Sequence, residues 1–180
     1  DHVYVRNIDG SVIDLTPGEN LKASFVDWHE DDKQFFITSN ERDPKYFDLY
    51  KYQISYYSRE LVYQNVSGYQ IGDISSNGRW LALTKANSNS DSDIFLIDLN
   101  SEGQTSIMVA GSAPEDVALG VYTFTPDNQK LLYASNADGE FNQAMSYDVK
   151  NQANSVSFSA DLDVSFSYFS EDGKYRVTGI

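Results

Sequence analysis

A repeat of 45 to 50 residues constrains the fold of this chain more than any other feature of its sequence. Four stretches each begin with a large apolar residue, continue through an acidic or asparagine-rich turn, and end in an apolar run. They are WHEDDKQFFITSN from Trp28, ISSNGRWLALTKA from Ile74, FTPDNQKLLYASN from Phe124 and FSEDGKYRVTGI from Phe169. A fixed period of this length is typical of proteins built from stacked, similar units.

A second marker recurs in the same phase, about 20 residues after the first. It reads DLYKYQ from Asp48, DIFLID from Asp93 and QAMSYD from Gln143, and HVYVRN from His2 fits the same place one period earlier. Two markers with the same period make a chance similarity implausible, so we infer that each period of the sequence forms one structural unit.

Each period has the composition of β-structure. Runs rich in Val, Ile, Phe and Tyr are separated by Gly, Asn, Asp and Ser, and DIFLID is apolar on both faces of a strand, which predicts burial on both sides. Asn77-Gly78 and Asp172-Gly173 predict type I′ hairpin turns, in which both turn residues take a positive φ. We expect Asp32-Lys33 and Asn128-Gln129 to form weaker versions of the same turn.

Four strands per period predict an all-β fold, a β-propeller of four-stranded antiparallel blades. A β-sandwich is the alternative, but a sandwich would need no sequence repeat. About four blades' worth of strands are expected in a single propeller fragment, with a strand pair at 1–16, blades at about 24–64, 70–109 and 119–159, and a strand pair at 164–180.

The charge and the cysteine count narrow the range of partners. The 180 residues carry a formal net charge of −14, which disfavours nucleic acid and membrane surfaces because both are anionic. The chain has no cysteine, which excludes disulfides, thiolate metal sites and a cysteine nucleophile. Absence of cysteine leaves the compartment open, and we favour a periplasmic or secreted location over a cytoplasmic one.

The turn and strand motifs resemble those of two related propeller groups. TPDNQKLLYASN and SEDGKYRV resemble a repeated Ser-Pro-Asp-Gly-Lys turn followed by a strand, and NERDPKYFDLY (40–50) resembles a blade of bacterial prolyl oligopeptidase-type serine peptidases. The same pattern is similar to the blades of TolB-like propellers. The resemblance to the peptidases, a group that includes the dipeptidyl and acylaminoacyl peptidases, implies a propeller that caps an α/β-hydrolase domain and admits only short peptides.

The catalytic motif of those peptidases is missing from this chain. Their hydrolase domain carries a G-x-S-x-G nucleophile elbow, whereas the one pair of glycines with that spacing here, Gly68 and Gly72, encloses Gln70. The two histidines are His2, near the terminus, and His29, which we interpret as an ordinary turn residue. We therefore predict no catalytic residue in this chain, which should be inactive alone, and we expect the serine peptidase activity of its parent protein to lie in a separate hydrolase domain.

The strand pairs at the two ends of the chain could either join each other or remain apart. The chain begins at Asp1 and ends two strands into a repeat, so we expect a piece of a longer protein. The two end pairs could join into one blade and close a four-bladed ring. We favour an open arc, or a homodimer of arcs through exposed strand edges, because the blades of the family that the chain resembles are shaped for a larger ring.

One group of loops is the predicted contact surface. The connections between the second and third strands, and between blades, are the longer and more varied ones, with the sequences ERDPKYF, NSNSDS and AGSAPEDV. Function often lies on such loops over a rigid scaffold. In the first loop, Arg42 could pair with a carboxylate, while Tyr46 and Phe47 could supply apolar contact to the hydrolase domain or a peptide substrate. A purely structural role for these three residues is the alternative.

No cofactor or metal site is predicted. The segment 87–98 offers oxygen atoms at alternating positions, as a calcium-binding EF-hand loop does, but Ser92 stands where the loop needs glycine and Asp98 where it needs glutamate. Two other functions are alternatives to the peptidase domain. A TolB-like propeller would bind a protein partner without catalysis, and a polysaccharide-active propeller lacks an identifiable pair of catalytic carboxylates.

Overall fold

A computed structural model of the chain describes residues 1–111 and 117–180. The described residues form sixteen strands and no helix, so none of them belongs to a helix that could cross a membrane. The chain divides into two compact units, 1–71 and 72–180.

The strands fall into groups along the chain. In the first unit they are β1 (Tyr4–Arg6), β2 (Val12–Asp14), β3 (Ala23–Trp28), β4 (Gln34–Asp43), β5 (Tyr46–Gln53) and β6 (Arg59–Tyr63). The next group is β7 (Gln70–Ile74), which begins two residues before the boundary, β8 (Trp80–Ala86), β9 (Ser92–Asp98) and β10 (Ser106–Ala110). The last six are β11 (Leu119–Phe124), β12 (Lys130–Ser135), β13 (Gln143–Asp148), β14 (Ala153–Phe158), β15 (Phe166–Phe169) and β16 (Arg176–Gly179).

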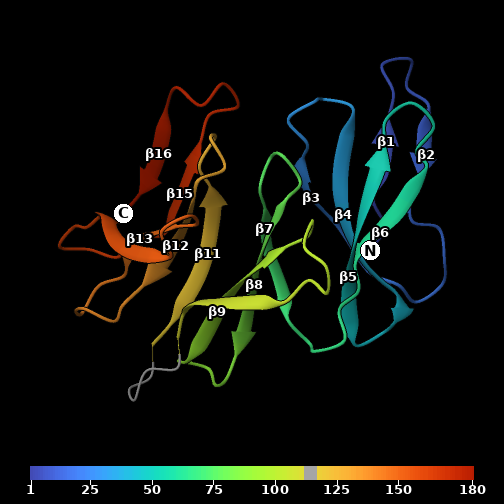
Figure 1. Ribbon diagram of the computed structural model, residues 1–180. Helices are drawn as coiled ribbons and strands as arrows, with labels where there is room; N and C mark the ends of the chain where they lie inside the picture. The colour runs from blue at the N-terminus through green and yellow to red at the C-terminus, as the bar shows by residue number, and fades with distance from the viewer. Residues whose placement is uncertain (112–116) are drawn as a thin grey trace. The chain divides into compact units, whose positions relative to one another are not determined.

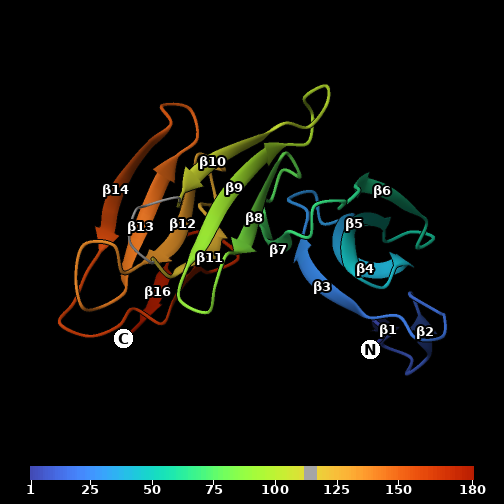
Figure 2. The same ribbon diagram turned by 90° about the horizontal axis from the view of Figure 1, so that it is seen from below.

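These strands pair in chain order into antiparallel sheets, as Figures 1 and 2 show. Three sheets have four strands each, β3 to β6, β7 to β10 and β11 to β14, while β1–β2 and β15–β16 are two-stranded. Strands that follow one another and lie side by side are the pattern of a propeller blade. The predicted all-β fold of four-stranded blades is confirmed.

Each unit has its own core between neighbouring sheets. In the first unit the β1–β2 pair packs against the β3–β6 sheet, through the buried residues Leu15, Leu21, Ala23, Phe35, Ile37, Tyr50 and Tyr52. In the second unit the β7–β10 and β11–β14 sheets pack face to face, through Ala82, Ile94, Leu96, Val109, Phe124, Leu131, Tyr133 and Tyr147. Apolar contact between neighbouring sheets therefore stabilises each unit.

Strand β9, which contains the apolar run DIFLID, is buried on both of its faces. Ile94 and Leu96 face the core of the second unit, and Ile97, on the opposite face of the strand, is equally buried. The prediction that DIFLID is covered on both sides is confirmed for this strand.

The hairpin between the first two strands of each blade differs from the prediction. In the turn Ser75–Gly78, the N–H of Gly78 donates to the carbonyl of Ser75 at 2.8 Å, and Gly78 has a φ of 69°. Asn77 does not have a positive φ, so the turn is type I followed by one left-handed residue, and the type I′ prediction is wrong. The reason is local, because the Oδ1 of Asn77 accepts from the N–H of Arg79 at 3.1 Å and from the hydroxyl of Ser75 at 2.8 Å.

The same geometry recurs in all four copies of the motif. The left-handed residues are Asp32 (φ 55°), Gly78 (69°), Asn128 (58°) and Gly173 (67°). The residues equivalent to Asn77-Gly78 are thus Asp31-Asp32 and Asp127-Asn128, one position earlier than predicted. The repeat therefore fixes the backbone path even where a non-glycine residue must take a positive φ.

Candidate functional site

Arg42 and Asp48 form an ion pair across the β4–β5 hairpin. The guanidinium donates from Nε to Asp48 Oδ2 at 2.6 Å and from Nη2 to Oδ1 at 2.8 Å, while the Asp48 side chain is fully buried. The same Nη2 also donates to the carbonyl of Asn65 at 2.7 Å, and the N–H of Asn65 donates to Asp48 Oδ1 at 2.8 Å. The neighbouring carboxylate raises the pKa of the Arg42 guanidinium above its usual range. These contacts tie the hairpin to the segment that follows β6.

Two of the predicted contact residues lie beside this ion pair. Tyr46 is the first residue of β5 and pairs with Asp43, the last residue of β4, while Phe47 follows it; both aromatic side chains are half-buried. Gly68, with a φ of 71°, lies against the Tyr46 ring, and a Cβ at that position would come within 3.4 Å of the ring. The structure therefore brings Arg42, Tyr46 and Phe47 together on one hairpin.

The predicted loop is mostly strand, which corrects its description. β4 extends through Asp43 and β5 begins at Tyr46, so Pro44 and Lys45 alone connect them. A register shift between Ser39 and Asp43 lets the strands continue, and the Arg42–Asp48 pair bridges them there. The connection between β8 and β9 is a loop, as expected, whereas Pro114 and its neighbours lie outside the described residues.

Arg42 retains donors for a further partner. None of the described residues accepts a hydrogen bond from its Nη1, and 32% of the side chain is exposed. A guanidinium fixed on one side and open on the other is suited to bind a second carboxylate. The hairpin can thus hold an acidic or C-terminal carboxylate on the face of β5 that Asp48 shares with the half-buried Tyr46, while Phe47 points to the other face.

A second polar cluster in the first unit was not predicted. Arg59 on β6 donates to Glu41 at 2.9 Å and to the Tyr52 hydroxyl at 3.2 Å, and its guanidinium lies 4.9 Å from the centre of the Tyr50 ring. Burial, helped by a hydrogen bond with Glu41, raises the pKa of Tyr50 to about 12. Tyr52 donates to the carbonyl of Leu15 at 3.1 Å, so the cluster connects β6 to the β1–β2 pair. No spacing rule relates these residues, and the sequence offers no signal for them.

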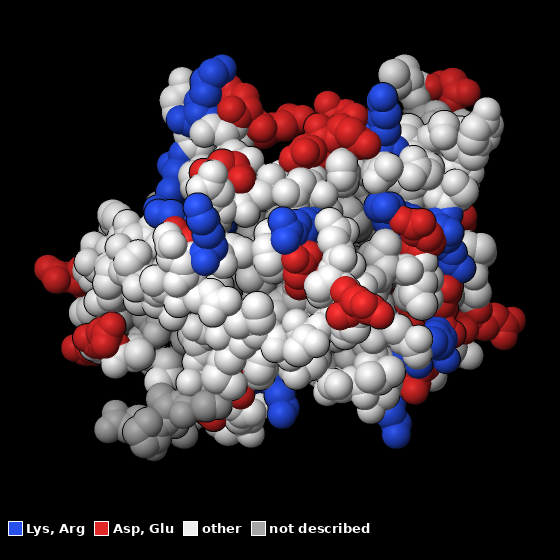
Figure 3. All heavy atoms as spheres, in the orientation of Figure 1, with Lys and Arg blue, Asp and Glu red and all other residues white. Residues whose placement is uncertain are grey.

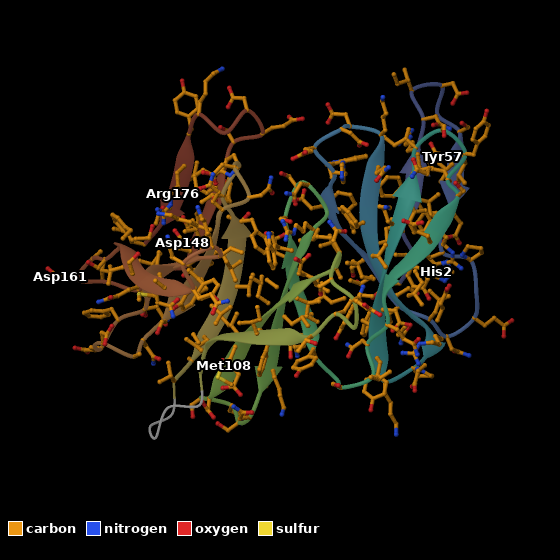
Figure 4. All side chains as sticks on the ribbon, in the orientation of Figure 1. His2, Tyr57, Met108, Asp148, Asp161 and Arg176 are labelled. Atoms are coloured by element: carbon orange, nitrogen blue, oxygen red, sulfur yellow. The ribbon has the colours of Figure 1, made fainter. Side chains whose placement is uncertain are left out.

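The histidines have structural partners. His2 Nδ1 lies 2.7 Å from Asp14 Oδ2 and Nε2 lies 3.0 Å from the carbonyl of Gly18, so both ring nitrogens face acceptors (Figure 4 labels His2). His29 opens the first turn, where its Nδ1 accepts from the N–H of Asp31 at 3.2 Å. Neither ring forms a hydrogen bond with a serine hydroxyl, so the described residues contain no assembled Ser-His-Asp triad.

The polar loop 87–91 leads into a buried aspartate. Asp93 accepts from Asn87 Nδ2 at 3.1 Å and occupies the position in β9 that Asp48 occupies in β5. Within residues 1–111 and 117–180, no three His, Cys, Asp or Glu side chains are grouped so that they could hold a metal ion. In the view of Figure 3, Lys and Arg side chains are scattered among acidic ones without a continuous basic patch.

Comparison with known proteins shows likeness in structure alone. No family model matches the sequence, and no curated protein matches it. TolB from Acinetobacter baumannii superposes with a TM-score of 0.69 at 19% identity, covering 97% of this chain and 42% of that one. A solved prolyl endopeptidase superposes with a TM-score of 0.59 at 12% identity, covering 82% of this chain and 23% of that one. A puromycin-hydrolyzing peptidase from Mycobacterium tuberculosis superposes with a TM-score of 0.53 at 12% identity, covering 87% of this chain and 24% of that one.

This chain spans less than half the length of each of these three proteins. At identities below 20%, the likeness establishes the fold and leaves the activity open. The chain has the β-propeller fold found in TolB and in the propeller domains of prolyl endopeptidases and related peptidases.

Proposed function

We propose that this chain is a non-catalytic part of the propeller domain of a prolyl oligopeptidase-family serine peptidase. In this role it supports an α/β-hydrolase domain of the same parent protein and limits access to short peptides. Two observations support the proposal: the fold is shared with two peptidases, and the blade sequence 40–50 resembles the peptidase repeat. Both peptidases are about four times as long as the matched region, which leaves room in them for other domains.

The β4–β5 hairpin is the proposed contact site for a peptide or for the hydrolase domain. Arg42 presents Nη1 beyond its pair with Asp48, and Tyr46 and Phe47 follow on β5 with part of each ring exposed, on opposite faces of the strand. A peptide carboxylate could accept from the guanidinium while an apolar side chain packs on the Tyr46 ring, and Phe47 could contact the hydrolase domain. Asp48 holds Arg42 rigidly, so little entropy would be lost on binding.

Kinetics on the complete product of the gene would test this contact. We expect Arg42→Ala and Tyr46→Ala each to lower kcat/KM for a short peptide severalfold. Arg79→Ala is the matched control, since Arg79 also pairs with an aspartate, Asp98, at 2.7 Å but lies in the second unit. Circular dichroism would verify folding of each variant at the assay temperature. Unchanged kcat/KM in both hairpin variants would count against the contact.

A TolB-like binding module is the second candidate function. It is favoured by the higher TM-score of 0.69 and by coverage of 97% of this chain. Such a module would bind a protein partner and take no part in hydrolysis. The gene sequence beyond codon 180 separates the two candidates: a G-x-S-x-G segment after further blades supports the peptidase, and a gene that ends without such a segment supports the module. A periplasmic or secreted location is proposed for either.

A further inference from the structure

Two arginines lie side by side on one face of the β3–β6 sheet. Asp48, Tyr50 and Tyr52 share this face, because side chains alternate along a strand. Arg42 pairs with Asp48, while Arg59 lies 4.9 Å from the centre of the Tyr50 ring and donates to the Tyr52 hydroxyl at 3.2 Å. The two guanidiniums therefore lie next to positions 48 and 50, which are about 7 Å apart along β5.

Each arginine is held by one carboxylate and keeps unused donors. Glu41 accepts from Nη1 of Arg59 at 2.9 Å, while Asp48 accepts from Nε and Nη2 of Arg42. No described residue accepts a hydrogen bond from Nη1 of Arg42 or from Nε and Nη2 of Arg59. The two side chains are 32% and 36% exposed, so a ligand can reach both of them.

The two carboxylates already have partners within the protein. Asp48 accepts from Arg42 and from the N–H of Asn65, and it is fully buried. Burial and a hydrogen bond with Glu41 raise the pKa of Tyr50 to about 12, so at neutral pH its hydroxyl is protonated and donates to Glu41. Both guanidiniums are thus fixed before a ligand arrives, which lowers the entropy lost on binding.

This pair of arginines is a departure from the repeat. Asn87 makes the contact in the β7–β10 sheet that Arg42 makes in this one, by donating to the aspartate at the start of the third strand. Ser106 and Asn154 take the place of Arg59 opposite the third strand in the other two four-stranded sheets. The fold therefore does not require two guanidiniums at these positions, and such departures are expected at functional sites.

We propose that the β4–β5 hairpin binds peptides whose C-terminal residue is Asp or Glu, with one carboxylate on Arg42 and the other on Arg59. The inference rests on the proposed peptide contact and names its ligand. Each hydrogen bond from a guanidinium spans about 3 Å, so a single residue with two carboxylates can lie between the two arginines. Tyr46, which shares the face of Asp48, is placed to contact the side chain before it.

A purely structural role is the alternative for both ion pairs. They would then stabilise the sheet, and replacing an arginine would change the stability of the protein without changing which peptide it prefers. A site with Arg42 alone would distinguish a free C-terminus from an amide, or an acidic side chain from a neutral one, but not both. Selectivity for two carboxylates is thus the property that identifies the proposed site.

Four peptides test the proposal on the complete product of the gene. They are Ala-Phe-Glu, Ala-Phe-Gln and the C-terminal amide of each. We expect Ala-Phe-Glu to be preferred over Ala-Phe-Gln, and over its own amide, by at least about tenfold in each case, since one charge-assisted pair distinguishes the two members of each comparison. The preference is taken from kcat/KM if the peptides are hydrolysed, and from Kd by calorimetry if they are not.

The outcomes separate this inference from the peptidase role. Both preferences without hydrolysis would support the site and overturn the peptidase role. Hydrolysis in which either preference is missing would overturn the inference alone. Neither binding nor hydrolysis of any of the four peptides would overturn both.

Variants assign the two arginines. Arg42→Lys and Arg59→Lys keep a positive charge beside the carboxylate but lose the fork of donors. Each should remove one of the two preferences and retain the other. Arg79→Lys is the matched control in the second unit and should retain both, with folding of every variant verified by circular dichroism. Two preferences that survive in both hairpin variants would contradict the assignment.

Discussion

Arg42 donates to both carboxylate oxygens of Asp48, at 2.6 and 2.8 Å, and Asp48 is fully buried. Removing the guanidinium would leave a buried carboxylate that accepts a hydrogen bond from the N–H of Asn65 alone among the described residues. We expect Arg42→Ala to lower Tm by roughly 5 to 10 °C, because an unpaired buried charge is strongly destabilising. Thermal unfolding followed by circular dichroism measures the change.

The double variant Arg42→Ala/Asp48→Asn provides the control. An uncharged Asn at position 48 needs no cationic partner. The Tm of the double variant should therefore be higher than that of Arg42→Ala, although still below that of the wild type. A double variant less stable than Arg42→Ala would show that the loss comes from packing of the arginine stem instead of from the ion pair.

The left-handed turn residues give a second prediction. Asp32 has a φ of 55°, which costs about 1 kcal/mol for a residue with a Cβ, so Asp32→Gly should leave stability unchanged or raise it by up to about 1 kcal/mol. Gly78→Ala introduces the same strain at a φ of 69° and should lower stability by a similar amount. Urea unfolding of both variants checks the signs. A clear loss in Asp32→Gly would mean that the aspartate side chain stabilises the turn.

Asp27 gives a prediction for pH. Burial is the main influence on this carboxyl and raises its pKa above the usual 3.8, although Oδ1 accepts from the N–H of Trp28 at 2.7 Å. A raised folded-state pKa favours the protonated form, so its stabilising contribution is complete below pH 3.8 and is lost as pH rises through the folded pKa. Asp27→Asn keeps the acceptor without the charge. It should be more stable than the wild type at pH 7 and nearly equal to it at pH 3.

Chemical unfolding at those two pH values tests the assignment. A stabilisation of equal size at both would show that the charge of Asp27 is not responsible. Lower stability at pH 7 would mean that the carboxylate makes a favourable contact beyond the N–H of Trp28.

Much of the fold could be predicted, because each blade repeats one apolar pattern. The strands β8 and β9 follow directly from runs such as LALT and DIFLID, and turn residues separate them. The turn type could not be read from Asn77-Gly78, because that dipeptide also fits a type I turn closed by a left-handed glycine. The choice depends on the Ser75 hydroxyl and the Asn77 side chain, which bond to each other.

The candidate site was predicted in part. Arg42, Tyr46 and Phe47 are adjacent in sequence, so their grouping on one hairpin needed no knowledge of long-range contacts. Arg59 and Arg176 gave no such signal, because their partners lie on other strands: Glu41 is 18 residues from Arg59, and Ser157 is 19 residues from Arg176. The Arg59–Glu41 contact crosses the β3–β6 sheet, and the Arg176–Ser157 contact joins two sheets; a repeat specifies neither of these side-chain pairs.

Mapping the serine that reacts with a fluorophosphonate in the complete gene product tests the central claim most directly. This reagent modifies activated serine nucleophiles, and mass spectrometry of the digested protein locates the adduct. We predict one labelled serine outside residues 1–180, together with hydrolysis of short peptides that labelling abolishes. A label within residues 1–180, or a complete product that takes up no label, would contradict the account.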